Sequence, residues 1–192
     1  MRYTIIGGIN GVGKSTIYSS LPDNDIKALG KRINVDEIVS VFGDWRDTTA
    51  QFHAGKQAVK EIKKCLEAKI DFQQETTLSG QSVIHTAKTA KAMGFIVHLW
   101  YIFVSNTEIA KQRVHDRVAN GGHGISDDII ERRSVTSLRS LRTIIPLCDE
   151  VWLYDNTVTY NPVAQVIGGT IILFNKNIPS HILSCLECKN IY

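Results

Sequence analysis

The 192-residue sequence lacks the features that mark membrane, secreted and nucleic-acid-binding proteins. No apolar run approaches the length of a transmembrane helix. The first predicted strand begins within a few residues of Met1, which leaves no room for a signal peptide. The formal net charge of +3 is too small to indicate a nucleic-acid-binding surface. We therefore expect a cytoplasmic protein that binds neither a membrane nor nucleic acid.

Patterns of metal-binding residues are also missing. The four cysteines include one C-x-x-C pair, Cys185 and Cys188, and no second pair stands at the spacing of a zinc site. The six histidines show no metal-ligand spacing either. We interpret Cys185 and Cys188 as ordinary core and tail thiols, because the thiols of a cytoplasmic protein are kept reduced.

A glycine-rich motif near the start of the sequence indicates a binding function. Residues Gly8 to Thr16 read G-I-N-G-V-G-K-S-T, which fits the P-loop, or Walker A, pattern G-x-x-x-x-G-K-[ST]. An apolar run at residues 3–7 precedes the motif, and a helix is predicted from Lys14 to near Pro22. In this strand–loop–helix setting a P-loop binds the phosphates of a nucleoside triphosphate. We therefore expect ATP as a cofactor.

The residue types of this loop suit phosphate binding. Glycines allow backbone conformations in which successive N–H groups point at a phosphate. Lys14 is expected to reach the β- and γ-phosphates, and the Ser15 hydroxyl is expected to complete the shell of a Mg²⁺ ion. The predicted nucleotide-binding residues are Gly8, Asn10, Gly11, Val12, Gly13, Lys14, Ser15 and Thr16, together with Asn156 in the adenine loop.

Strands and helices are predicted to alternate along the chain, as in a parallel sheet with helices on both faces. The length and the hydrophobic fraction of 43% fit one globular domain, and we find no repeat, low-complexity segment or linker. We expect an α/β P-loop NTPase fold with a five-stranded parallel sheet in the order 2-3-1-4-5, followed by a C-terminal β-hairpin at about residues 163–175. The predicted strands span residues 3–7, 31–35, 70–74, 95–104 and 151–154.

Two helices carry specific local predictions. The helix from about residue 54 to 69 is expected to bury Val59, Ile62 and Leu66 on one face. Ser105 and Glu108 are expected to form a capping box at the start of the following helix that carries Arg113. Each prediction names side chains whose burial or hydrogen bonding a structure can test.

Acidic residues follow three of the predicted strands, at Asp36, Glu75 and Asp155. The carboxyl ends of parallel strands form the ligand-binding edge of such a sheet. We predict that Asp36 orients and deprotonates an acceptor hydroxyl, and the alternative is an N-cap of the helix that begins at Glu37. Glu75, with Thr76 and Thr77, is expected to hold the water shell of Mg²⁺ or the substrate hydroxyls, and the alternative is a polar turn.

Arginines gather in one part of the chain, on either side of the glycine-rich segment 121–124. This arrangement is typical of a lid that closes over a triphosphate, and we place the lid at about residues 113–133. Arg113 and Arg117 share one helical face, and Arg132 or Arg133 is expected to meet them at the same phosphate. His123 either contacts a phosphate or is a plain loop residue.

The chain resembles the zeta toxin family of P-loop kinases over most of residues 3–156. Besides the P-loop, four segments carry the resemblance: INVDEI at 33–38, QETTLS at 74–79, RVHDRVANGGH at 113–123 and YDN at 154–156. The resemblance implies an ATP- and Mg²⁺-dependent phosphotransferase. It also implies Asp36 as the catalytic base, with Lys14 and Arg117 or Arg113 as catalytic cations.

Zeta toxins phosphorylate the 3′-hydroxyl of the amino sugar in UDP-N-acetylglucosamine. The resemblance therefore implies this compound as the acceptor and an antitoxin protein as a partner, although the chain is similar to the small stand-alone branch of the family. Two alternatives stay open: a kinase of a different nucleotide, sugar or sugar acid, and a non-catalytic ATP-dependent regulator. The predicted substrate-binding residues are Asn34, Asp36, Glu75, Thr76 and Thr77.

Overall fold

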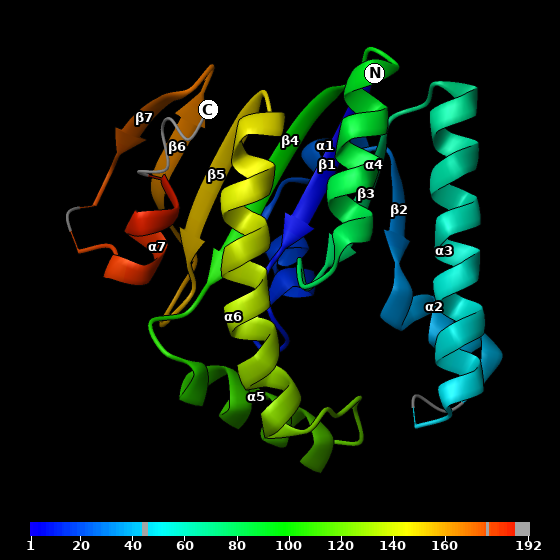
Figure 1. Ribbon diagram of the computed structural model, residues 1–192. Helices are drawn as coiled ribbons and strands as arrows, with labels where there is room; N and C mark the ends of the chain where they lie inside the picture. The colour runs from blue at the N-terminus through cyan, green and yellow to red at the C-terminus, as the bar shows by residue number, and fades with distance from the viewer. Residues whose placement is uncertain (44–45, 176, 187–192) are drawn as a thin grey trace.

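The computed structural model describes residues 1–43, 46–175 and 177–186, and it has one mixed sheet of seven strands (Figure 1). The strand order is β2-β3-β1-β4-β5-β6-β7. The first five strands are parallel, whereas β6 and β7 pair antiparallel. The strands are β1 (Arg2–Gly7), β2 (Lys31–Asn34), β3 (Phe72–Thr76), β4 (Ile96–Phe103), β5 (Glu150–Asp155), β6 (Asn161–Ile167) and β7 (Thr170–Leu173).

The predicted order of the parallel strands is confirmed, but the predicted strand number of five is wrong. The C-terminal hairpin joins the sheet because β6 pairs with the otherwise free edge of β5. The hairpin turns at Gly168 and Gly169, which both have positive φ angles, as a two-residue hairpin turn requires. The sheet is therefore extended on the side away from β2.

Helices cover both faces of the sheet (Figure 1). The α4 and α6 helices lie on the near face in this view, and η1 and α1 lie on the far face. No described helix is long and apolar enough to cross a membrane. The helices are η1 (Lys14–Ser20), α1 (Asp23–Ala28), α2 (Val35–Phe42), α3 (Thr48–Ala68), α4 (Gln81–Ala92), α5 (Thr107–Ala119), α6 (Asp127–Ile144), η2 (Ile145–Leu147) and α7 (Ser180–Leu186).

The core divides into two main layers because successive residues of a strand point to opposite faces. Tyr3 and Ile5 of β1 belong to the larger layer, which α3, α4, α6 and α7 complete. Ile6 belongs to the smaller layer, which includes Ile17 of η1 and Val114 of α5. The smaller layer anchors the P-loop, since Ile9 and Val12 are buried in it.

Two predictions about helices are wrong in detail. The helix after the P-loop is a 3₁₀-helix, in which Thr16 N–H donates to the Gly13 carbonyl three residues back. Val59 is 61% exposed, because the buried stripe of α3 runs through Ala58 in its place, whereas the predicted burial of Ile62 and Leu66 is confirmed. The small alanine side chains of this stripe let α3 pack closely on its neighbours.

The starts of α5 and β3 also differ from the predictions. The cap of α5 is Asn106, whose Oδ1 accepts from Ile109 N–H, so the capping box of Ser105 and Glu108 is not formed. Strand β3 begins at Phe72, because the backbone N–H of Ile70 still closes the end of α3 by donating to Cys65. Glu75 and Thr76 therefore lie within β3 rather than in a turn after it.

Candidate active site

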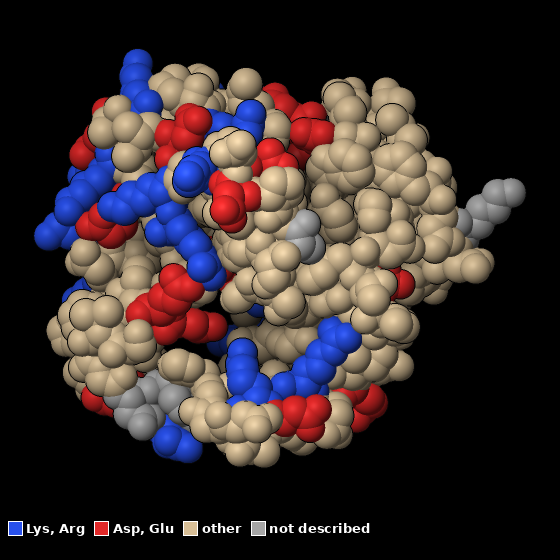
Figure 2. Space-filling view, turned by 180° about the vertical axis from the view of Figure 1, so that it is seen from behind, with Lys and Arg blue, Asp and Glu red and all other residues tan. Residues whose placement is uncertain are grey.

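A cavity of about 750 Å³ opens at the carboxyl ends of β1, β2 and β3. Figure 2 shows it as a dark hollow with acidic side chains on its left margin and basic side chains above and below. The P-loop, the start of α2, the end of β3 and the arginine-bearing helices α5 and α6 all line it. The predicted site residues in this lining are Asn10, Gly11, Gly13, Lys14, Ser15, Thr16, Asn34, Asp36, Glu75, Thr76, Thr77, Arg113, Arg117, His123 and Arg133.

The P-loop has the backbone conformation that its glycines predict. Gly11 and Gly13 have φ angles of +81° and +91°, in a region that side chains rarely allow. A Cβ at Gly11 would also collide with the backbone of Ala110 in α5. The loop is thus closely packed on the smaller core layer and keeps its polar edge toward the cavity.

Lys14 projects along this loop, where its Nζ donates to the Ile9 carbonyl at 3.0 Å. Burial lowers the pKa of Lys14 to about 8, although the negative charges of Asp36 and Glu75 raise it. The positive charges of Arg117 and Arg133 lower this pKa further. Cations from the P-loop and the lid therefore converge, which favours an anionic ligand between them.

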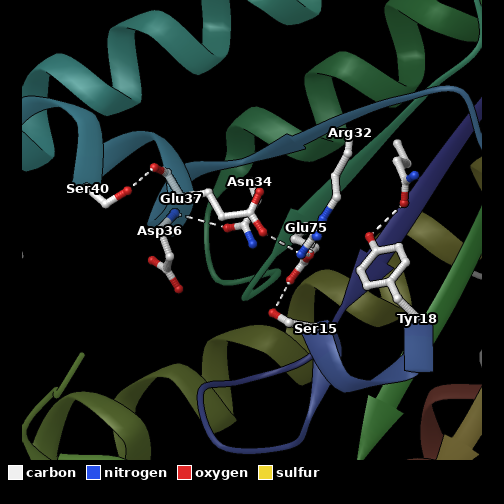
Figure 3. A network of polar contacts seen from close by, with 9 residues as sticks. Ser15, Tyr18, Arg32, Asn34, Asp36, Glu37, Ser40 and Glu75 are labelled. Carbon is white, nitrogen blue, oxygen red and sulfur yellow. Dashed lines mark hydrogen bonds and ion pairs between the residues drawn. The ribbon is translucent and has the colours of Figure 1, made fainter. Parts of the chain in front are cut away.

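Ser15, Glu75 and Arg32 form a polar cluster (Figure 3), and the charge of Glu75 in this cluster raises the pKa of Lys14. Ser15 Oγ donates to Glu75 Oε2 at 2.8 Å, and Arg32 donates to Glu75 Oε1 from Nε at 3.0 Å and from Nη2 at 2.5 Å. The Glu75 side chain is only 4% exposed. A hydroxyl next to a carboxylate fits the oxygen ligands that Mg²⁺ prefers. Sequence reasoning did not identify Arg32, whose single signal is its position in β2, beside β3 in the sheet.

Asp36 lies in the first turn of α2 with an exposed carboxylate that lines the cavity. The cap of α2 is Asn34, whose Oδ1 accepts from the backbone N–H of Asp36 at 3.0 Å. The alternative interpretation of Asp36 as an N-cap is therefore wrong. Figure 3 shows the Asp36 carboxylate pointing away from the Arg32–Glu75 pair. Its negative charge raises the pKa values of Lys14 and Arg133.

The lid arginines reach the cavity from two helices. Arg133 of α6 donates from Nη1 to Asn10 Oδ1 of the P-loop at 2.7 Å. Arg113 of α5 donates from Nη2 to the Thr157 carbonyl at 3.1 Å, whereas Arg117 is exposed at the cavity lining. Arg132 is exposed and lies outside the lining. Of the arginines that were predicted for the lid, three thus face the site.

Two residues after β5 support the P-loop from behind. Asn156 is buried, and its Nδ2 donates to the Val12 carbonyl at 2.8 Å. The Tyr160 hydroxyl donates to the Gly13 carbonyl. Burial raises the pKa of Tyr160 to about 12, so the hydroxyl keeps its proton at neutral pH. Sequence reasoning missed Tyr160. It identified Asn156, whose predicted contact with adenine stays a prediction.

The other predicted features lie apart from this cavity. Cys185 is buried in α7, and Cys188 lies outside the described residues. Among the described residues, no group of three or more histidine, cysteine or acidic side chains is placed to hold a metal ion. The Mg²⁺ prediction therefore depends on Ser15 and Glu75 together with ligands from a bound triphosphate.

The fold has counterparts among solved structures. One chain of the PezAT toxin–antitoxin system of Streptococcus pneumoniae aligns with a TM-score of 0.59 at 18% identity, over 83% of this chain and 70% of that one. One chain of the AvrRxo1-ORF1:-ORF2 structure with ATP aligns with a TM-score of 0.66 at 18% identity, over 91% of this chain and 60% of that one. At these identities the likeness concerns the fold alone.

Sequence comparisons identify the family. An uncharacterized protein of Haemophilus influenzae is 39% identical over 126 residues, which are 66% of this chain and 87% of that protein. The family model of the Zeta toxin matches residues 2–161, which include the P-loop, Asp36, Glu75 and the lid. The chain therefore belongs to the Zeta toxin family of P-loop kinases.

Proposed function

We propose that the protein transfers the γ-phosphoryl group of ATP to a hydroxyl group of a small molecule. The observation that carries this proposal is the composition of one cavity, which is lined by a P-loop, three lid arginines and the exposed carboxylate of Asp36. A nucleotide-binding regulator needs the P-loop but has no need for that carboxylate. The cavity therefore favours a kinase over a non-catalytic regulator.

The phosphate end is formed by the P-loop and the lid. Backbone N–H groups of the loop and the Lys14 ammonium bind the β- and γ-phosphates, and Arg117 and Arg133 approach from the other side. Ser15 and Glu75 would hold Mg²⁺, which when bound neutralises charge on the phosphate oxygens. The AvrRxo1-ORF1:-ORF2 structure with ATP, one chain of which shares this fold, supports ATP as the nucleotide.

The acceptor end is formed around Asp36. Its carboxylate takes the proton of the acceptor hydroxyl while the hydroxyl oxygen forms its bond to the γ-phosphorus. The bond from that phosphorus to the β–γ bridging oxygen breaks, and ADP leaves with the electron pair. Asn34 orients Asp36, because its side chain caps α2 at the Asp36 amide. Lid closure over the cavity excludes water as a competing acceptor.

The acceptor implied by the family resemblance is UDP-N-acetylglucosamine, and it is the first compound to test. The alternatives are other nucleotides, sugars and sugar acids. The protein is incubated with Mg²⁺ and ATP, and the acceptor is analysed by mass spectrometry for the addition of one phosphoryl group. ATP binding without transfer to any hydroxyl compound, in a broad panel, would contradict the proposal.

An antitoxin partner is a further part of the proposal. A chain of the PezAT toxin–antitoxin system shares the fold of this one. An antitoxin would act by covering the cavity or by holding the lid away from the P-loop. Co-purification of the protein with the product of a neighbouring gene, followed by loss of phosphoryl transfer in the complex, would support this partner.

A further inference from the structure

The two outer strands of the sheet differ in charge. The outer strand β2 has Lys31 and Arg32, and charged side chains at a sheet edge discourage pairing with a further strand. The other outer strand, β7, lies within residues 156–175, which include no aspartate, glutamate, lysine, arginine or histidine. Figure 2 shows this end of the sheet on its right side, with few charged side chains at the surface. The β7 edge therefore lacks the usual protection against pairing with a further strand.

The backbone of β7 has hydrogen-bonding groups on its free side. In an antiparallel pair, every second residue of a strand bonds to its neighbour, and the residues between them face the other way. The Phe174 N–H donates to the Val163 carbonyl at 2.9 Å, and Ile172 faces β6 in the same alternation. The N–H and C=O groups of Ile171 and Leu173 therefore point away from β6. Among the described strands, none pairs with β7 on that side.

The side chains at this edge are apolar and half exposed. Ile172 is 42% exposed, Leu173 is 50% exposed and Phe174 is 51% exposed. The Phe174 ring stacks on Trp152 of β5, with centroids 5.7 Å apart, on the face of the sheet opposite the larger core layer. The edge thus combines unpaired backbone groups with exposed apolar side chains, which is the combination that favours addition of a further strand.

We infer that β7 pairs with β7 of a second copy of this chain, antiparallel about a two-fold axis, so that the two sheets become one. A two-fold axis requires antiparallel strands, and an antiparallel edge is complementary to itself. When the axis passes through Ile172, the free groups of Ile171 meet those of Leu173 of the second copy, and the reverse. Ile172 then lies beside Ile172 of the second copy. This register satisfies the outward backbone groups of both strands.

The size of this edge predicts a weak dimer. The half-exposed apolar side chains and the paired backbone would bury on the order of 500 Å² per copy, which is near the lower limit for a specific interface. We therefore expect a dissociation constant in the micromolar range. The described lining of the active-site cavity includes no residue of β6 or β7, so both cavities of the dimer stay open. The inference does not depend on the proposed kinase function.

The test measures the mass of the full chain in solution. Analytical ultracentrifugation from about 1 to about 200 µM should show wild type changing from monomer to dimer. Ile172→Lys places two charges side by side at the two-fold axis and should raise the dissociation constant at least tenfold. Ile70→Lys is the matched control, because Ile70 is 45% exposed and lies between α3 and β3, away from β7. It should leave the dissociation constant unchanged.

A second variant tests the backbone pairing itself. Leu173→Pro removes an N–H that points away from β6, so it keeps the hydrogen bonds within the hairpin, and proline is accepted at a sheet edge. It should also weaken the dimer at least tenfold, with the far-UV circular dichroism of wild type. Wild type that stays monomeric at the highest concentration would overturn the inference, even if β7 then bound a different protein. A dimer that both variants leave intact would overturn it as well.

Discussion

The two ends of the cavity differ in how the chain builds them. The phosphate end starts from a continuous motif, in which the residues from Gly8 to Thr16 are neighbours in sequence and in space. The acceptor end is assembled around Asp36 from α2, β3 and α4, which only the sheet topology brings together. The phosphate end is rich in cations, whereas the acceptor end has the Asp36 carboxylate. Nucleotide binding is therefore a local property of the sequence, whereas acceptor choice is a property of the fold.

The largest expected effect is at the acceptor end, from Asp36→Asn. The variant keeps the shape and the Asn34 cap but removes the proton acceptor, so kcat should fall about 10³-fold, within the range for general bases. ATP binding, measured by calorimetry, should change little. Asp128→Asn is the matched control, because Asp128 is also the second residue of a helix and lies outside the cavity. A kcat within threefold of wild type for Asp36→Asn would mean that Asp36 is not the catalytic base.

The next largest expected effect is a loss of folding stability when the ion pair of Arg32 and Glu75 is broken. Arg32→Met leaves the Glu75 carboxylate buried without its cation, which should cost about 3 kcal/mol of the free energy of unfolding. Urea denaturation measures this loss. The double variant Arg32→Met/Glu75→Met should recover most of the loss, because no unpaired charge remains. A single variant as stable as wild type would mean that the pair contributes nothing to the fold.

At the phosphate end, Arg117→Ala should reduce kcat/KM about a hundredfold, because a lid cation near Lys14 stabilises charge on the transferring group. Arg132→Ala is the control, since Arg132 is exposed and lies outside the cavity. Its kcat/KM should stay within about twofold of wild type. Equal losses in the two variants would indicate a general effect of surface charge instead of a lid contact.

The smallest effect is a pH dependence of ATP binding. Burial lowers the pKa of Lys14 to about 8 in the folded protein, from an ordinary value of 10.5. Between these values the unfolded chain binds more protons at Lys14, so this residue opposes folding at low pH and opposes it less as the pH rises. A triphosphate favours the ammonium form. Above pH 8 binding must take up a proton, and affinity should fall by up to about tenfold per pH unit.

Isothermal titration at pH 7, 8 and 9 measures this dependence for wild type and for Lys14→Met. The variant should bind ATP more weakly at every pH and should lose the pH dependence. If Lys14→Met keeps the slope of wild type, a different group titrates on binding and the assignment to Lys14 fails.

The contrast between the two ends also explains what the sequence predicted well. The P-loop, the order of the parallel strands and the family all follow from local motifs and from strand–helix alternation, and these predictions were confirmed. Backbone conformations that favour glycine can be predicted from the positions of the glycines in the sequence. Gly11 and Gly13 illustrate this, because they adopt positive φ angles that glycine allows and other residues rarely adopt.

Features that depend on contacts between distant segments were missed. Arg32 meets Glu75, 43 residues away, and Tyr160 meets Gly13, 147 residues away. No sequence pattern around Arg32 or Tyr160 predicts these contacts. The pairing of β6 with β5 was missed for the same reason, since an open sheet edge is visible only after the sheet is formed. The roles of Asp36 and the lid arginines stay predictions.

The account is tested most directly by following the phosphoryl group itself. The protein is incubated with Mg²⁺ and ATP that is labelled with ¹⁸O in the γ-phosphoryl group, together with N-acetylglucosamine and UDP-N-acetylglucosamine, and both acceptors are analysed by mass spectrometry. We predict labelled product on one of the two acceptors with wild type, and almost none with Asp36→Asn. Labelled product from Asp36→Asn at the wild-type rate would contradict the account.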